Sequence, residues 1–363
     1  MNGGIKIEEI KEKEFGSKIE GIFILSNADI KETKSGDFFL IGTLKDASGK
    51  ISFISWDIKD VEYCRYNITN YQVFRVKGIL DSYQDKLRIK AEEIIPVKKD
   101  SLSLEILEKL VPSITSEERE YYFEKIKSLF KKLKNKKARI LIKKLFSNDK
   151  FVKIFRKAPA AIKVHHAYLG GLLRHTANVM ELAYEFYNRY KRYMKNIDLD
   201  IILLSSFFHD IGKINEYTFE INFSSTDEGK LIGHTIISYE FFSQLVSQIE
   251  DFPNHIELGV KHCILSHHGE IEWGAVVLPK TVEALIVSLA DYVDSKVIQA
   301  IESIDKIEMG TWSAYNNFLK RSIFSSQYEL LENKNPLKEV LKKDEKIENK
   351  INLSPISNNL FNT

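Results

Sequence analysis

The chain has 363 residues, 44% of them apolar, which is enough for two or three domains with a sizeable core. The formal net charge is only +2, so any surface that binds nucleic acid must be a local concentration of positive charge. The two widely separated cysteines, Cys64 and Cys263, argue against a disulfide framework and favour a reducing cytosol. The N-terminus has no apolar leader and no run approaches the ~18 apolar residues of a membrane span, so we expect a cytoplasmic protein without a membrane partner.

Residues 1–100 are expected to form a small all-β barrel. Polar residues alternate with β-branched and aromatic ones in five runs, and turn residues separate these runs. The predicted strands are 18–25, 38–44, 51–56, 71–80 and 86–95. Between the third and fourth strands, residues 57–70 are long enough for a short helix. This pattern resembles the OB-fold.

The resemblance extends to the nucleic-acid-binding branch of that fold. It rests on Gly42-Thr43-Leu44-Lys45-Asp46, followed by Gly49-Lys50-Ile51 and Ser55-Trp56-Asp57. OB-folds bind single-stranded nucleic acid or oligosaccharide, although many act only as protein–protein modules. The candidates for base stacking or phosphate contact are Phe39, Phe53, Trp56, Tyr83, Lys86 and Arg88. The alternation does not decide which of these aromatic residues belong to the barrel core.

Residues 101–160 are expected to be a helical connector. Thr115–Glu118 is a capping-box pattern that begins a long charged helix. Residues 131–137 form a basic run within that helix, which is either a solvated face or a nucleic-acid contact. From about residue 161 to residue 330 the pattern is helical. Residues 331–363 are polar and rich in Asn and Lys, and we expect a partly disordered tail.

The helical part of the chain contains a series of histidines and aspartates that could bind metal: His175, His209, Asp210, His234, His267, His268 and Asp291. Asp210 follows the apolar run 203–208, and a carboxylate there is costly to bury unless something compensates its charge. A metal cluster would do so, and imidazole with carboxylate suits Mn, Fe or Zn. The spacing of roughly 25–35 residues suggests one ligand group per helix of a bundle.

The ordered series His, His-Asp, His, His-His, Asp resembles the HD-domain phosphohydrolase superfamily, in which such residues hold one or two divalent metals inside an all-α bundle. The resemblance implies that Asp210 bridges two ions. It also implies that the other six ligands divide into two sets: His175, His209 and Asp291, and His234, His267 and His268. His268 fits least well, since adjacent residues on a helix point about 100° apart. We expect two divalent ions, with Mn first and Fe, Mg, Zn or Co as alternatives.

Several residues near this series have two readings. Lys213 either supplies a cation to the metal site or is an ordinary surface lysine. His166, with its neighbour His165, either contacts phosphate and protonates the leaving oxygen or orients a helix. Asp294 lies one turn after Asp291 and either orients a ligand, contacts substrate or is a plain helix carboxylate. The expected catalytic residues are therefore Asp210, Lys213 and His166.

Three motifs narrow the resemblance to the YhaM-type 3′-to-5′ exoribonuclease family. They are 165–176 (HHAYLGGLLRHT), 231–234 (LIGH) and 266–270 (SHHGE), and the order of barrel, connector and HD domain agrees. The similarity covers about residues 15–325. Arg174 departs from the acidic residue expected there, and it joins the nucleic-acid-binding candidates. The resemblance implies a metal-dependent phosphodiesterase that degrades single-stranded RNA to nucleoside 5′-monophosphates, and it leaves single-stranded DNA open as a substrate.

Two other functions remain alternatives. One is an HD-domain nucleotide or cyclic-nucleotide phosphohydrolase with a regulatory barrel. The absence of a Gly-Tyr-Pro element after His267-His268 argues against its cyclic-dinucleotide branch. The other is a non-catalytic RNA-binding protein, against which the complete ligand series argues. The native metal and the oligomeric state, including a homo-oligomer, are left open.

Overall fold

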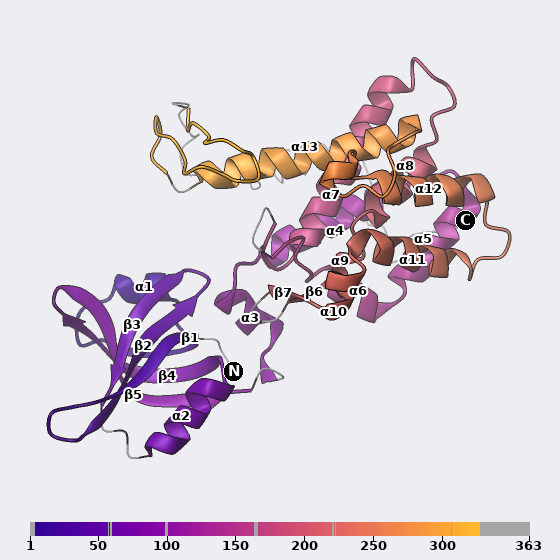
Figure 1. Ribbon diagram of the computed structural model, residues 1–363. Coiled ribbons are helices and arrows are strands. Elements are labelled where there is room, and N and C mark those ends of the chain that lie inside the picture. Colours follow the sequence, from indigo (N-terminus) through magenta and orange to yellow (C-terminus); the bar gives the residue numbers. More distant parts are fainter. Residues whose placement is uncertain are drawn as a thin grey trace, which may run out of the picture. The chain divides into compact units, whose positions relative to one another are not determined.

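The computed structural model describes residues 4–56, 58, 60–98, 101–162, 166–219, 221, 223–305 and 307–326. The chain divides into two compact units (Figure 1). The first contains Met1–Ile114 and Thr218–Ser224, and the second contains Thr115–Tyr217 and Ser225–Thr363. The finer division at residues 100, 160 and 330 stays a prediction. The expected polar tail, 331–363, lies outside the described residues.

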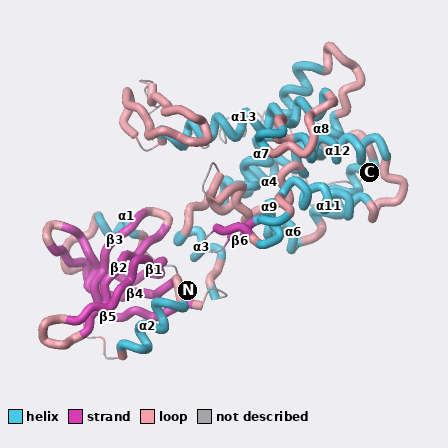
Figure 2. Tube along the Cα trace, in the orientation of Figure 1, coloured by secondary structure: helices cyan, strands magenta, loops and turns pink. Residues whose placement is uncertain are grey.

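The first unit contains a closed five-stranded barrel, which confirms the predicted OB-like fold (Figure 2). The strands are β1 (Lys18–Glu32), β2 (Phe38–Asp46), β3 (Gly49–Ser55), β4 (Val73–Tyr83) and β5 (Lys86–Val97). Their order around the barrel is β1-β2-β3-β5-β4. The β3–β5 pair is parallel, whereas the other four pairs are antiparallel. The expected short helix is α2 (Val61–Asn70), which lies between β3 and β4.

Asp46 fixes one end of the barrel. Its Oδ1 accepts hydrogen bonds from the backbone N–H groups of Ser48 and Gly49 at 2.8 and 3.0 Å, which shapes the β2–β3 turn. Its Oδ2 accepts the N–H of Ile7 at 2.7 Å, at the start of helix α1 (Ile7–Lys11). Ile7 and Ile10 of this helix are fully buried with the apolar side chains of all five strands. The short helix therefore plugs the barrel, and burial of these side chains stabilises it.

Strand β1 is longer than its alternation predicts. The pairing with β2 shifts register between Ser26 and Asp29, and Asn27 lies in the left-handed region with φ 51°. Such a β-bulge inserts an extra residue and breaks the period of two. The sequence pattern therefore stops at Leu25, although the strand continues to Glu32.

The second unit is a bundle of helices. The connector region contributes α4 (Ser116–Phe130), α5 (Lys136–Phe146) and α6 (Asp149–Phe155), after α3 (Leu104–Leu110) of the first unit. The remaining helices are α7 (Gly171–Tyr190), α8 (Leu199–Phe208), α9 (Lys213–Glu216), α10 (Asp227–Leu231), α11 (His234–Val246), α12 (Asn254–Ser266), the short 3₁₀ helix η2 (Ile271–Trp273) and α13 (Val282–Ile304). None of the described helices has the length and apolar character needed to cross a membrane.

Helix α8 is the centre of this bundle. All ten of its residues are buried, and it packs against α7, α12 and α13. A helix that is apolar on every side belongs in a protein interior. Phe207 is fully buried and its ring contacts those of Phe130, Phe155 and Phe208 at centroid distances of 5.0–5.2 Å. Because α8 ends at Phe208, residues 209 and 210 lie in the middle of the bundle.

The structure confirms one expectation for the connector, the capping box, and corrects another, the position of the basic run. The capping box at Thr115 is confirmed: its side chain accepts the N–H of Glu118, and the Glu118 carboxylate accepts the N–H of Thr115. The long helix ends at Phe130, however, so the basic run 131–137 spans the turn into α5. The Asp200 carboxylate holds this turn by accepting the N–H groups of Lys134 and Asn135 at 2.7 and 2.6 Å.

Besides the turns between helices, two parts of the helical region 161–330 are not helical. Strands β6 (Tyr217–Phe219) and β7 (Phe223–Ser225) form a two-stranded sheet. After α13, residues 307–326 are non-helical, with backbone bridges that join Trp312 to Phe324 and Asn316 to Arg321. Strands of three residues and irregular loops leave no periodic signal in a sequence.

Candidate metal centre

The bundle brings all seven predicted ligands together at its centre. His175 lies on α7, His209 and Asp210 follow α8, and His234 is the first residue of α11. His267 and His268 follow the end of α12, and Asp291 lies on α13. The five segments are far apart in the sequence, so tertiary packing alone creates the cluster.

One set of ligand atoms surrounds the Oδ2 atom of Asp210. The Nε2 atom of His175 lies 3.3 Å from this oxygen, and the Nε2 atom of His209 lies 3.5 Å from it. The same two nitrogens are 3.2 Å apart, and they lie 3.2 and 3.9 Å from Oδ1 of Asp291. His175, His209 and Asp291 therefore converge on one small volume.

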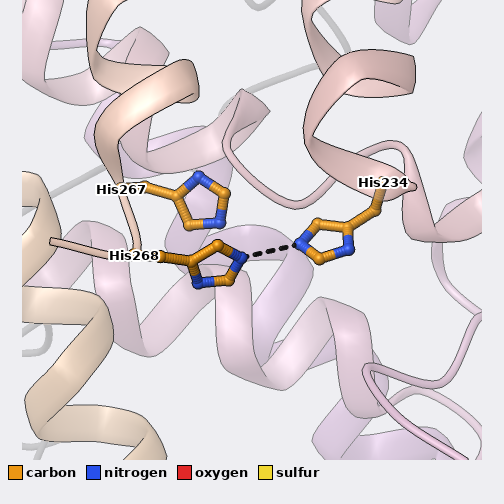
Figure 3. Close-up of side chains that lie close together, drawn as sticks. All are labelled: His234, His267 and His268. Carbon is orange, nitrogen blue, oxygen red and sulfur yellow. Dashed lines mark hydrogen bonds between the residues drawn. The ribbon is translucent and has the colours of Figure 1, made fainter. Parts of the chain in front are cut away.

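A second set of ligand atoms surrounds the other oxygen of Asp210. The Nε2 atoms of His234 and His267 lie 3.3 and 3.7 Å from Oδ1. His234 and His268 point toward each other, with their Nε2 atoms 3.2 Å apart (Figure 3). His268 thus joins the set although it is adjacent to His267, and both residues follow the last turn of α12.

These distances fit divalent metal ions. An ion about 2.1 Å from each N or O ligand holds those ligand atoms about 3.0–3.5 Å apart in octahedral or tetrahedral geometry. Oδ1 of Asp210 and Nε2 of His267 are buried, and neither has a hydrogen-bond partner among the described residues. Buried polar atoms are rarely left unsatisfied, so two that face each other point to a missing ligand.

The other ring nitrogen of four of these histidines is already engaged. Nδ1 of His209 donates to the carbonyl oxygen of Ser206, and Nδ1 of His267 donates to that of Ile264, at 2.8 and 2.6 Å. The two remaining Nδ1 atoms contact carboxylates: His175 contacts Asp294 at 2.7 Å, and His234 contacts Glu216 at 3.0 Å. The bonds to the carbonyl oxygens place the proton of His209 and His267 on Nδ1 and leave their Nε2 lone pairs directed at the cluster.

Charge within the cluster also suits metal binding. Burial opposes ionisation of Asp210, but the Lys213 ammonium and the neighbouring imidazoles hold the pKa of that carboxyl well below its ordinary value. Burial, assisted by the neighbouring imidazoles, lowers the pKa of His267 well below its ordinary value and that of His268 to about 4. The carboxylate is thus charged and these imidazoles are neutral at pH 7, which are the protonation states that metal ligands need.

Gly212 allows the two ligand segments to approach. Its N–H donates to Oγ of Ser238 on α11 at 2.8 Å. A Cβ atom at position 212 would lie 2.2 Å from the backbone oxygen of His234, which is far too close for any side chain. Glycine therefore lets the turn after Asp210 pack directly on the start of α11.

Comparison with known proteins agrees with this geometry. Residues 172–296 match the family model described as HD domain. The chain contains an HD domain. The matched range includes all seven predicted ligands.

The HD domain is part of a longer similarity to curated proteins. The chain is 26% identical over 314 residues to the 3′-5′ exoribonuclease YhaM of Bacillus velezensis, covering 86% of this chain and 94% of that protein. It is 27% identical over 315 residues to YhaM of Oceanobacillus iheyensis, covering 86% and 93%. YhaM of Bacillus subtilis is 26% identical over 318 residues, covering 86% and 94%. The predicted resemblance to YhaM-type proteins is confirmed.

Two matching solved structures are too distant to inform the function. One is a replication protein A heterotrimer bound to ssDNA, with 20% identity, a TM-score of 0.18, and coverage of 24% of this chain and 61% of that chain. The other is a murine DNA binding protein bound with ds DNA, with 14% identity, a TM-score of 0.20, and coverage of 26% and 49%. Scores of this size carry no argument.

Lys213 and His166, two of the residues near the predicted ligands, have clear positions. Nζ of Lys213 lies 2.6 Å from Oδ2 of Asp210, so its charge is directed at the cluster. His166 is fully buried, and its two ring nitrogens contact the Tyr168 hydroxyl at 2.7 Å and Asp294 at 3.0 Å. Through Asp294 it lies behind the ligand His175, and its expected catalytic role stays a prediction. His165 lies outside the described residues.

Asp294 is an orienting carboxylate of the HD domain, one of the readings that the sequence left open. Its Oδ2 contacts both His175 and His166, and its Oδ1 accepts a hydrogen bond from the Asn178 amide at 2.8 Å. Glu216 plays the corresponding part for His234 and was missed by sequence reasoning. Its only sequence signal is its position three residues after Lys213, which is too common a pattern to identify it.

The predicted nucleic-acid contacts of the barrel need one correction. Phe53 is 2% exposed within the barrel core, so it cannot stack on a base. Trp56 is 47% exposed and packs on half-buried Phe39, with ring centroids 4.8 Å apart. Tyr83 is 58% exposed and lies under the guanidinium of Arg88, while Lys86 is exposed. The Arg88 charge is partly balanced by Asp81, with an Nη2–Oδ2 distance of 2.8 Å.

Arg174 lies beside aromatic side chains within the second unit. Its Nη1 donates to the Tyr168 hydroxyl at 3.2 Å, and its guanidinium lies 6.0 Å from the centre of the Tyr122 ring. The side chain is half-buried. These contacts account for the position of Arg174 without a nucleic acid, and its predicted role as a nucleic-acid contact stays a prediction.

We predict that Asp210→Ala removes both metal ions, whereas His234→Ala removes mainly the ion of the second set. The reason is that each Asp210 oxygen faces a different set, while His234 faces only one. Plasma mass spectrometry after desalting should find about two ions per chain in the parent protein. It should find nearly none in the Asp210→Ala protein and about one in the His234→Ala protein. Asp227→Ala and His255→Ala are matched controls with exposed side chains. Full metal content in the Asp210→Ala protein would contradict the shared-carboxylate arrangement.

Proposed function

We propose that this chain is a metal-dependent 3′-to-5′ exonuclease that hydrolyses single-stranded RNA to nucleoside 5′-monophosphates. The observation that carries the proposal is the position of Asp210, whose two oxygens face two separate sets of ligand atoms. Such a carboxylate can bridge two ions about 3.5–4 Å apart, the separation typical of two-metal phosphodiesterases. Similarity to YhaM exoribonucleases over 86% of the chain supports the substrate and the direction.

Some residues of the site would bind the metal ions, and others orient the ligand side chains. Two divalent ions, which we propose to be manganese, would supply Lewis acidity toward the phosphoryl group and a water activated at neutral pH. Asp291 and the five ligand imidazoles hold their Nε2 and carboxylate oxygen atoms at the cluster, and Asp210 supplies both of its oxygens. Lys213 keeps Asp210 ionised, because its ammonium lies against Oδ2. Asp294 and Glu216 prevent rotation of two ligand rings.

The products follow from the bond that breaks. Attack of water on phosphorus expels the 3′ oxygen of the preceding nucleotide, so the phosphate remains on the 5′ oxygen of the released nucleotide. The shortened strand keeps a 3′ hydroxyl. This route needs no 2′ hydroxyl, and we therefore expect slow cleavage of single-stranded DNA.

An end-labelled RNA assay tests the proposed reaction. With Mn²⁺ present, 5′-labelled single-stranded RNA should give a descending ladder, whereas 3′-labelled RNA should release a labelled mononucleotide at once. An RNA blocked at the 3′ end by duplex is the matched control, and it should resist because both parts of the enzyme need an unstacked strand. Cleavage of circular RNA, or products with 2′,3′-cyclic phosphate, would contradict the mechanism. Hydrolysis of mononucleotides alone would favour a nucleotide phosphohydrolase, and retention of intact RNA would favour a non-catalytic binder.

We also propose that the barrel supplies affinity for the strand while the HD domain supplies the chemistry. Trp56 and Tyr83 offer exposed rings for stacking, and Lys86 and Arg88 offer cations for phosphate.

The two cysteines are free, and Cys263 is buried. A reducing compartment suits them, so we propose a cytoplasmic enzyme.

Replacing Trp56 with Ala should raise KM for a long single-stranded RNA by about tenfold and leave kcat nearly unchanged. The reason is that stacking of one base on an aromatic ring contributes about 1–3 kcal/mol to binding. Steady-state kinetics at two salt concentrations would measure this, with a steeper loss at high salt because phosphate contacts release counterions. Phe15→Ala is the matched control, since Phe15 is 68% exposed in the same unit. Equal kinetics for both variants would remove Trp56 from the strand-binding surface.

A further inference from the structure

A cavity of about 740 Å³ adjoins the candidate metal centre and lies wholly within the second unit. Its first end is lined by the ligand candidates His267, His268 and Asp291. Its other end is lined by residues 318–321 and 323, from the non-helical segment after α13. The volume falls within the range of about 300–1,000 Å³ that is typical of ligand sites. We call this cavity the α13 groove.

Helix α13 gives the groove its direction. The helix carries the ligand candidate Asp291, and the next residue, Tyr292, begins a series at intervals of four with Lys296, Ala300 and Ile304. Residues four apart share one face of a helix. From Asp291 to Ile304 this face is about 20 Å long at 1.5 Å per residue. The groove therefore extends from the candidate metal centre along one side of α13. Figure 1 shows α13 as one continuous helix.

The wall nearest the metal centre is aromatic and exposed. The rings of Trp273 and Tyr292 are stacked, with centroids 5.4 Å apart and planes inclined by 16°. They are 57% and 41% exposed, so part of each ring is open to solvent. An exposed ring face at this position can stack on a nucleic-acid base without regard to sequence.

The far part of the groove is basic. Lys296, Lys320 and Arg321 line it, and among the described residues none of the three forms an ion pair with a carboxylate. Lys296 instead contacts the carbonyl oxygen of Phe318 at 3.2 Å, and its ammonium lies 5.7 Å from the Tyr292 ring centre. Three unpaired cations beside an acidic and imidazole-rich centre suit a polyanion that spans both.

A rigid turn holds two of these cations. The side-chain oxygen of Asn316 accepts the N–H groups of Phe318 and Leu319 at 2.9 and 3.0 Å. Backbone hydrogen bonds join Asn316 and Arg321 in both directions. Lys320 adopts the left-handed conformation with φ 53°, which is uncommon for a residue with a side chain. Local strain of this kind persists only where surrounding contacts enforce it.

We propose that the α13 groove binds the 3′-terminal nucleotides of the single-stranded substrate. Trp273 and Tyr292 stack on a base next to the reacting phosphate, and Lys296, Lys320 and Arg321 contact the phosphates further along the strand. The inference rests on the proposed exonuclease function and extends it, because it places recognition of the strand end within the HD-containing unit. A strand that is already paired cannot offer a free base face to Trp273, so the groove also selects against duplex ends.

The test uses the full chain and three variants. Trp273→Ala removes the stacking ring, and Lys320→Gln/Arg321→Gln removes two charges while keeping long side chains. The matched control is Lys191→Gln/Arg192→Gln, because these residues form the same exposed dipeptide elsewhere in the second unit. Each protein is assayed on a single-stranded RNA decamer and on bis(p-nitrophenyl) phosphate. Binding of a 5′-fluorescein RNA with a free 3′ end is measured separately by anisotropy, with metal withheld.

The groove variants should raise KM for the decamer by about tenfold and weaken RNA binding by a similar factor, whereas hydrolysis of the small diester, which is too short to span the groove, should change by a smaller factor. The control should resemble the parent protein in all three measurements. Unchanged KM and RNA binding in the groove variants would overturn the inference. A change in sedimentation without a change in RNA binding would also overturn it, since the groove would then be a contact between copies of the chain.

Failure of the proposed function gives a different result. If the parent protein cleaves the small diester but not RNA, the exonuclease proposal fails, and the binding measurement still decides the groove. Loss of RNA binding in both groove variants but not in the control would then support a strand-binding groove. Equal loss in the groove variants and the control would contradict it.

Discussion

The structure of the second unit depends on one buried carboxylate, that of Asp210. It is 2% exposed and follows a helix in which every residue is buried. A charge in such surroundings costs several kcal/mol unless opposite charges or metal ions compensate it. Lys213 supplies one positive charge at Oδ2, while Oδ1 faces the imidazole nitrogens of His234 and His267. Four of the five ligand segments bring imidazoles to the cluster, whereas Asp291 on α13 adds a second negative charge.

Contacts around the ligand candidates fix the orientation of their imidazole rings. The Nδ1 atoms of four histidines contact either backbone carbonyl oxygens or the carboxylates of Asp294 and Glu216. Because these partners lie on helices or next to them, the directions of the ring nitrogens are set by the packing of the bundle. Preorganisation of this kind lowers the cost of binding a metal ion, since few side chains must be ordered afterwards.

Much of this site follows from the sequence, and the limits have physical causes. The ligand series was visible because His and Asp are rare in apolar helical surroundings, and the capping box at Thr115 was visible because capping is local. Glu216 and the position of His166 were not predictable, since both depend on contacts between distant segments. Phe53 is buried in the barrel whereas Trp56 is exposed, and the sequence did not distinguish them. Alternation shows that a strand has two faces, but closure of the barrel decides which face is inside. The bulge at Asn27 and the non-helical segment after α13 broke periodicity and left no signal.

The central claim is that Asp210 bridges two metal ions, and electron paramagnetic resonance of the manganese-loaded protein tests it most directly. Two Mn²⁺ ions that share a carboxylate at about 3.5–4 Å are magnetically coupled, whereas ions in separate sites are not. The account predicts a coupled spectrum at full loading of the parent protein, and its replacement by the spectrum of an isolated ion in the His234→Ala variant. A parent protein that shows only isolated Mn²⁺ at full loading would contradict the account.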